Sequence, residues 1–355
     1  MTETPALTTD WSVRPYRSGD ERAIADLFER TFSTTHSPEH FRWKLDPPWC
    51  GVVPAQLAHQ RDRLIGQYGG TDVRVWLEGE SLRAVHASDA MTDASFRRSG
   101  VLTRLGTEAH AAWKRDGAAF VYGLPHEGWG TRRVALGWEG LFHARWMWLP
   151  IPGPHPLSSR YAFLERLRSL WEPLLRARFE RRLARLRRDS GEVTVQERTP
   201  APSELDAIWE RLRERYAAVV VRDAAWVRHR YLESPDRRYR IALAYRSGRP
   251  EGYAVFRVRR DRRAWLVDLF TDPTDGHVRD GLFAWMLHHF RRSGVSSVSA
   301  LATSPGIAAS FRRAGFFPAK GRYEVSAVPL VSDPLPAILR NPAKWFTMAG
   351  DFDIV

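Results

Sequence analysis

Cysteine is almost absent from this chain: Cys50 is the only one in 355 residues. A single cysteine excludes an internal disulfide and is typical of a reducing compartment. No apolar run approaches the roughly 20 residues that a membrane-spanning helix needs. The first residues also lack the basic start and apolar core of a signal peptide. We therefore expect a cytoplasmic protein without a membrane span.

Several catalytic signatures are missing as well. The sequence has no paired-cysteine zinc spacing, no His-Glu-x-x-His and no Gly-x-Ser-x-Gly nucleophile elbow. His288 and His289 are adjacent, so on a helix they would face different directions and would not form a ligand pair. The sequence therefore predicts no metal site.

Positive charge is what the chain has in excess, with a formal net charge of +13 at pH 7. Such a surplus attracts acidic partners, including nucleic acid, anionic lipid, an acidic carrier protein or a phosphorylated cofactor. An arginine-rich composition spread over the surface would give the same charge, so both interpretations stay open. The length allows two domains, each with its own core.

One stretch combines a strand, a basic turn and a helix start. Residues 85–91 are strand-like, residues 97–100 read Arg-Arg-Ser-Gly, and a helical pattern begins at Val101. The first amides of a helix are unpaired and its dipole favours an anion there. Arginine adds charge-assisted donors. The stretch therefore predicts a phosphate-binding turn.

This turn resembles the pyrophosphate loop of the GNAT superfamily of N-acyltransferases, whose pattern is Q/R-x-x-G-x-G/A. Residues 97–102 read R-R-S-G-V-L, with Leu102 where the family usually has Gly or Ala. The resemblance implies acetyl-CoA or a longer acyl-CoA as cofactor. By position it also implies that the strand backbone holds the pantetheine arm and the loop amides hold the diphosphate. The cofactor-binding residues expected from it are Ala90, Met91, Thr92, Arg97, Arg98, Ser99, Gly100, Val101 and Leu102.

A weaker internal repeat follows. Residues 91–93 (Met-Thr-Asp) are echoed by residues 270–272 (Phe-Thr-Asp), and Gly137-Trp138 is echoed by Gly315-Phe316. Residues 304–316 resemble a second segment of the same family. The second copy lacks the loop pattern, and Asp280 there would repel phosphate. We therefore expect a structural or substrate-side role for that copy.

The expected fold class is α/β (α+β), with two tandem GNAT-like domains. Each would have a mixed, largely antiparallel sheet flanked by helices, and a basic helical linker would join them. The expected parts are an N-terminal domain with the cofactor loop (1–150), the linker (151–200), a degenerate C-terminal domain (201–332) and an aromatic tail (333–355). The tail resembles the W-x-x-x-x-G-D-x-D ending of bacterial tandem GNAT-like proteins linked to polysaccharide or natural-product assembly.

Local patterns place the elements of the first part. Asp20 is a candidate N-cap for a helix over 20–32, residues 41–49 are expected to form an aromatic loop, and Gly117 is expected to end the helix that begins near Val101. In the linker, residues 157–188 have a basic helical pattern that Pro173 should kink or split. That helix could dock an acyl carrier protein or a membrane surface, or pack on both domains. The expected strands cover residues 11–16, 55–59, 64–68, 73–77, 85–91 and 118–124.

Acylation of an amine requires a group that removes the amine proton. His86 stands where some GNAT members keep a glutamate, and its ordinary pKa of about 6.5 suits a base. Strand alternation puts Asp89 on the opposite face, and Glu127, next to His126, follows the next strand. His86, Asp89 and Glu127 are therefore the candidate catalytic residues. The tyrosine that commonly protonates the thiolate in the family is replaced by Arg133, and by Phe311 in the second copy.

The function expected is a coenzyme A-dependent N-acyltransferase that moves an acetyl or longer acyl group to a small-molecule, peptide or lipid amine. One alternative is a GNAT-type fatty acyltransferase that uses an acyl carrier protein. An alternative of another class is a non-catalytic tandem scaffold that binds an acidic partner or nucleic acid, although no nucleic-acid motif is present.

Overall fold

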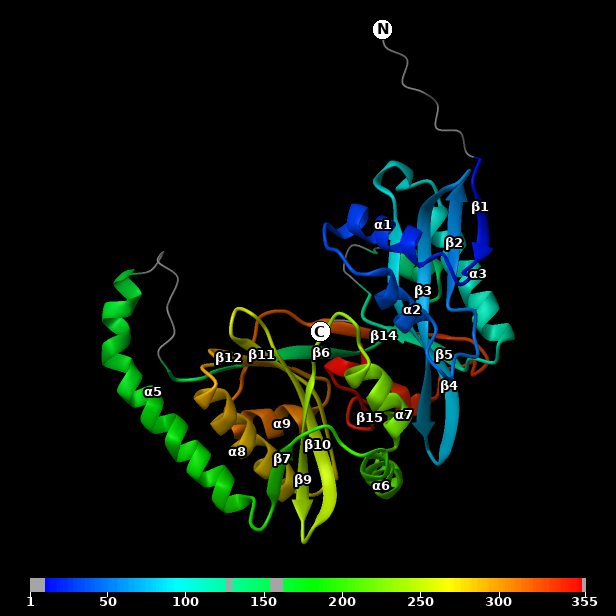
Figure 1. The fold of residues 1–355 in the computed structure, drawn as a ribbon. Helices are drawn as coiled ribbons and strands as arrows, with labels where there is room; N and C mark the ends of the chain where they lie inside the picture. Colours follow the sequence, from blue (N-terminus) through cyan, green and yellow to red (C-terminus); the bar gives the residue numbers. More distant parts are fainter. Residues whose placement is uncertain (1–9, 126–128, 130, 154–161, 353–355) are drawn as a thin grey trace.

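A computed structural model describes residues 10–125, 129, 131–153 and 162–352 (Figure 1). It is a mixed α/β fold in which helices flank a long, mostly antiparallel sheet, so the expected fold class is confirmed. The strand order is β1-β2-β3-β4-β5-β14-β6-β12-β11-β10-β9-β7. Among the described residues, no helix has both the length and the apolar character that crossing a membrane requires.

The elements up to residue 150 begin with a strand and two helices and end with a long strand. They are β1 (Ser12–Pro15), α1 (Glu21–Phe32), α2 (Pro38–Leu45), β2 (Ala55–Gln60), β3 (Arg63–Leu77), β4 (Glu80–Thr92), η1 (Ala94–Phe96), α3 (Val101–Arg115), β5 (Phe120–Gly123), α4 (Thr131–Ala135) and β6 (Glu139–Pro150).

The remaining elements begin with the longest helix. They are α5 (Ala162–Asp189), β7 (Thr194–Glu197), α6 (Pro202–Leu212), η4 (Arg213–Arg215), β8 (Ala218–Val220), α7 (Ala224–Val227), η5 (Arg228–Leu232), β9 (Arg240–Arg246), β10 (Arg249–Val258), β11 (Arg263–Thr271), α8 (Gly276–Arg292), β12 (Ser297–Ala302), α9 (Pro305–Ala314), β13 (Phe317–Pro318), β14 (Tyr323–Pro329), η6 (Ala337–Arg340), β15 (Trp345–Phe346) and η7 (Ala349–Asp351).

The same pairing pattern occurs twice along the sheet. β3 and β4 are antiparallel, β4 and β5 are parallel, and α3 connects the parallel pair. Likewise β10 and β11 are antiparallel, β11 and β12 are parallel, and α8 connects them. Residues 91–93 and 270–272, which the sequence repeat aligned, therefore lie at the ends of corresponding strands, β4 and β11.

The sheet crosses the expected domain boundaries. β14 lies between β5 and β6, with Ala327 opposite both Tyr122 and Glu139. β6 in turn pairs with β12 on its other side. The division at residues 150, 200 and 332 stays a prediction, but the first part of the sheet contains a strand from near the C-terminus.

Three local expectations need correction. Residues 41–49 are not a loop throughout, because α2 begins at Pro38 and ends at Leu45; Ser37 caps it by accepting from the amide of His40 at 3.2 Å. The strands expected at 64–68 and 73–77 are one strand, β3. Asp20 stands at the N-cap of α1 but does not cap it, because its carboxylate binds Arg14 at 2.7 Å.

The sequence predicts that Pro173 kinks or splits the linker helix; α5 runs through Pro173 without interruption, so it is not split, and the kink stays a prediction. Its C-terminal half packs against α8 and buries Phe179, Leu183 and Leu186. The expected helix end near Gly117 is confirmed, since α3 ends at Arg115 and Gly117 follows with φ 82°.

A buried ion-pair network joins the C-terminal segment to the core. Arg222 is fully buried, and its guanidinium contacts the carboxylates of Asp268 at 3.1 Å and Asp351 at 2.6 Å, which are also fully buried. The guanidinium also lies over the rings of Trp226, Phe270 and Phe346. Residues 345–352 are therefore part of the core.

Candidate functional site

The loop after β4 leaves the first turn of α3 without a side-chain cap. Gly100 stands at the N-cap with φ 83°, a left-handed conformation that glycine adopts without strain. Glycine has no side chain to bond the helix amides, and the first turn of α3 contains no acidic residue. Helix geometry leaves these amides unpaired, and the dipole favours an anion beside them.

A cavity of about 700 Å³ lies over this helix start. Arg97 and Arg98 line it, and none of its lining residues is acidic. Apart from Ser99, whose hydroxyl donates to the carbonyl of Phe96 at 2.6 Å, every residue expected to bind the cofactor lines the cavity. Leu102 also packs on the core cluster beneath α3. The full lining is Thr31, Phe32, Ala90, Met91, Thr92, Phe96, Arg97, Arg98, Gly100, Val101, Leu102, Thr103 and Trp129.

The corresponding helix of the second half, α8, differs at its start. The carboxylate of Asp275 accepts from the amides of His277 at 2.9 Å and Val278 at 3.4 Å. Asp280 is buried and lies 3.0 Å from the guanidinium of Arg313. A carboxylate therefore already occupies the position where α3 could receive a phosphate.

A β-bulge interrupts β4 near the inner end of the cavity. Gln67 of β3 faces Met91 and Gly69 faces Ser88, so β4 has one extra residue in this interval. Asp89 lies in the bulge with φ 51°, a conformation that few residues other than glycine adopt. Its carboxylate contacts the ammonium of Lys44 at 2.5 Å, and both side chains are nearly buried.

β4 and β5 separate just before this bulge. They pair only at Val85 with Val121 and at His86 with Tyr122, whereas β4 continues to Thr92. A second cavity of about 330 Å³ lies beside the separating strands. It shares Phe32, Ala90 and Trp129 with the first cavity, so the two adjoin along β4. Its lining is Phe28, Phe32, His36, Ala87, Ser88, Asp89, Ala90, Gly123, Leu124, Pro125, Trp129, Trp138 and Arg237.

The candidate bases from the sequence lie in different places. Asp89 lines the second cavity, whereas His86 lines a third and smaller one of about 40 Å³ together with Lys44 and Tyr122. The His86 ring lies 5.3 Å from that of Tyr122, whose hydroxyl donates to the carbonyl of Asp351 at 3.2 Å. Burial raises the pKa of Tyr122 well above its ordinary value. Glu127, with its neighbour His126, lies outside the described residues.

The two residues at the family's tyrosine position have structural contacts. Arg133 forms an ion pair with Glu324 and donates to the hydroxyl of Ser326 at 3.1 Å, so it holds β14. Phe311 is fully buried in α9. Neither lines one of the two cavities along β4.

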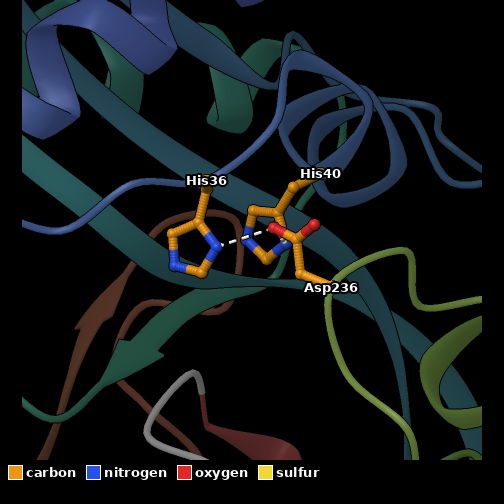
Figure 2. A group of neighbouring side chains, drawn as sticks. All are labelled: His36, His40 and Asp236. Atoms are coloured by element: carbon orange, nitrogen blue, oxygen red, sulfur yellow. Dashed lines mark hydrogen bonds and ion pairs between the residues drawn. The ribbon is translucent and has the colours of Figure 1, made fainter.

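A group that the sequence did not reveal lies at the edge of the second cavity. His36 follows α1, His40 belongs to α2, and Asp236 comes from the loop after η5 (Figure 2). The Nδ1 atoms of His36 and His40 lie 2.8 and 3.4 Å from the same carboxylate oxygen of Asp236. One ligand atom from each residue lies within 4.8 Å of the others, so the three could hold a metal ion. The only sequence signal was the four-residue spacing of the two histidines.

The strand, loop and helix start resemble those of a GNAT domain, and a family model matches this part of the chain. Residues 12–140 match the family model described as "Acetyltransferase (GNAT) domain". A comparison with curated protein sequences gives no match.

Solved structures extend the likeness beyond that domain. A probable N-acyltransferase from Enterococcus faecalis V583 is 13% identical over 91% of this chain and 73% of its own, with a TM-score of 0.64. A GCN5-related N-acetyltransferase from Kribbella flavida is 14% identical over 93% and 72%, with a TM-score of 0.61. Yeast N-myristoyltransferase with bound myristoyl-CoA, from Saccharomyces cerevisiae, is 10% identical over 92% and 84%, with a TM-score of 0.60. The shared feature is the fold.

Proposed function

We propose that this chain is a coenzyme A-dependent N-acyltransferase that moves an acetyl or longer acyl group to an amine. The observation that carries the proposal is the contrast between the two corresponding helices. The start of α3 has a glycine N-cap and opens on a cavity lined by two arginines. The start of α8 is capped by Asp275.

In this proposal the diphosphate binds the amides of residues 98–102 and the side chains of Arg97 and Arg98. The pantetheine arm follows the backbone of residues 90–92. The thioester reaches the second cavity, where β4 has separated from β5. The backbone groups of the bulge are suited to orient its carbonyl, since donors fixed near a developing oxyanion stabilise it.

The reaction is a nucleophilic substitution at the thioester carbonyl. The amine nitrogen forms the new C–N bond, the C–S bond breaks, and the thiolate leaves and takes up a proton. The amine must lose a proton to a base. His86, Asp89 and Glu127 stay the sequence-derived candidates for that base.

The second cavity favours an acyl group larger than acetyl. Its lining includes Phe28, Phe32, Leu124, Trp129 and Trp138, and apolar walls of this kind accept an alkyl chain. Transfer from acyl-CoA of several chain lengths would define the preferred donor.

Titration calorimetry with coenzyme A tests the proposal. We expect the double variant Arg97→Ala, Arg98→Ala to bind coenzyme A at least about tenfold more weakly, because a hydrogen bond to a charged group contributes about 1.5–3 kcal/mol. The matched control is Arg104→Ala, one turn into α3, where the guanidinium pairs with Glu108 at 2.9 Å. Equal affinity of both variants, or no binding by the wild type, would contradict the proposal.

An acyl carrier protein as donor is a second candidate, favoured by the surface of α5. A cavity of about 580 Å³ between α5 and β6 is lined by Trp148, Leu175 and Phe317, which are exposed, and by Arg178. Such an apolar site beside arginine suits an acidic partner. Arg181 is exposed on α5, three residues after Arg178. We expect Arg178→Glu with Arg181→Glu to abolish transfer from the carrier while transfer from coenzyme A continues. Loss of both activities would contradict a carrier-specific surface.

A further inference from the structure

A histidine in the wall of the second cavity is a further candidate for the base, besides His86, Asp89 and Glu127. His36 lines this cavity together with Ala87, Asp89 and Gly123, at the point where β4 and β5 separate. Its side chain is 15% exposed, and the ring makes an edge contact with Phe28 at 5.2 Å between centroids. The ring is therefore fixed in the wall and still accessible from the cavity.

Asp236 sets the proton position on the His36 ring. The carboxylate oxygen lies 2.8 Å from Nδ1. Burial raises the pKa of Asp236, but the hydrogen bond with His36 and the nearby His40 ring outweigh it, so the pKa is lowered from its ordinary value. An ionised carboxylate only accepts hydrogen bonds, so Nδ1 carries the hydrogen. The basic nitrogen of the neutral ring is then Nε2, on the side away from Asp236 (Figure 2).

His40 contacts both His36 and Asp236. Its ring stacks on that of His36 at 4.1 Å between centroids and 15° between planes, and its side chain is only 3% exposed. The other charged groups that line the cavity are Asp89, which contacts Lys44, and Arg237. The contact between Nδ1 of His36 and the Asp236 carboxylate fixes the orientation and the tautomer of the ring.

From these contacts we infer that His36 is the general base of the acyl transfer and that Asp236 is its positioning residue. The inference rests on the proposed function. The amine loses its proton to Nε2 of His36 as nitrogen attacks the thioester carbon and the C–S bond breaks. The thiolate of coenzyme A then takes a proton, from the imidazolium or from water, so that amide and free thiol are the products.

A competing assignment is that His36, His40 and Asp236 form a metal site. Both Nδ1 atoms approach one carboxylate oxygen of Asp236, at 2.8 Å from His36 and 3.4 Å from His40. The shorter distance is that of a hydrogen bond between His36 and Asp236, which accounts for the geometry without an ion. The experiment includes the metal as an outcome.

Two acceptor amines distinguish a loss of base catalysis from a general loss of activity. A simple alkyl amine such as butylamine, which has no second amino group, is mostly protonated at neutral pH, because alkyl amines of the lysine side-chain type have a pKa near about 10.4. Hydroxylamine is unprotonated there and reacts without a base. We expect His36→Gln to lower kcat with the alkyl amine by at least about 100-fold and to change the hydroxylamine rate by less than about threefold. Asp236→Asn should lower kcat with the alkyl amine by at least about tenfold, with KM unchanged.

The controls make each outcome decisive. His143→Gln replaces an exposed histidine of β6 and should match the wild type. An equal loss of kcat with both acceptors in His36→Gln, or no loss with either, would overturn the assignment of His36 as the base. If that variant still binds acyl-CoA, the proposed function would stand. A chelator that abolishes the wild-type activity, with zinc restoring it, would assign the group to an ion and overturn the base. If the wild-type protein transfers the acyl group to neither acceptor, the proposed function is wrong and the assignment of His36 fails with it.

Discussion

Replacing Arg222 with methionine removes the cation that holds two carboxylates in the core. Arg222, Asp268 and Asp351 are all fully buried, at contact distances of 3.1 and 2.6 Å. Removing one partner of a buried ion pair leaves an uncompensated charge and costs about 3–5 kcal/mol. A single arginine here faces two carboxylates, so we expect a loss of stability at the upper end of that range.

Urea unfolding monitored by tryptophan fluorescence measures the loss. With a slope of about 1–3 kcal/mol per molar urea, the midpoint of Arg222→Met should fall by at least about 1 M. The matched control is Arg259→Met, whose side chain is 42% exposed and lies 3.6 Å from Asp261. An exposed pair contributes less than about 1 kcal/mol, so its midpoint should barely move.

A triple variant shows how much of the lost stability comes from the unpaired carboxylates and how much from the lost packing of the arginine side chain. Arg222→Met with Asp268→Asn and Asp351→Asn has the same packing loss at residue 222 as the single variant, because Asn is nearly isosteric with Asp, but it removes all three charges. We expect it to be more stable than Arg222→Met alone. Equal midpoints for Arg222→Met and Arg259→Met, or a triple variant no more stable than the single one, would refute this reasoning.

Three further predictions concern the helix starts and a buried histidine. Gly100→Ala places an L-residue at φ 83°, so the melting temperature should fall by the equivalent of about 1–2 kcal/mol. Calorimetry should also show weaker binding of coenzyme A. An unchanged melting temperature together with unchanged affinity would contradict the role of this turn. Asp275→Ala removes the cap of α8 and should cost about 1 kcal/mol in urea unfolding, with coenzyme A affinity unchanged. Burial lowers the pKa of His110 from 6.5 to about 4, so its contribution to stability is full above pH 6.5 and is lost as pH falls through about 4. His110→Gln should remove that part of the pH dependence, and parallel wild-type and variant curves across the window would contradict it.

Local signals explain which parts of the fold could be predicted. The strand-to-helix turn at residues 85–101 was visible because a glycine, two arginines and a change of hydrophobic period fall within a few residues. The helix α2 was not predicted, because its aromatic residues and the prolines at 47 and 48 are typical of a loop. Its start nevertheless has a strong N-terminal signal, with Ser37 at the N-cap and Pro38 at the first helical position. The continuity of β3 depends on its pairing with β4 from Gly66 to Leu77, which no local pattern records.

The candidate site divides in the same way. Most residues around the first cavity lie between positions 90 and 103, so one motif located them, whereas Thr31, Phe32 and Trp129 come from other segments. The partner of His36 is 200 residues away at Asp236, and nothing near either residue indicates the other. The bulge at Asp89 was also invisible, because it arises from the register of two strands. Alternation assigned faces to His86 and Asp89 as if the strand were regular.

The position of β14 has a consequence for how the chain is made. Synthesis proceeds from the N-terminus, so β5 and β6 leave the ribosome long before the strand that lies between them. The first part of the sheet stays incomplete until residue 329 has emerged, and two hydrogen-bonding edges remain exposed during that interval. We expect nascent chains that stop before β14 to need chaperones and to be sensitive to proteases, and the first part of the sheet to close only after β14 has emerged.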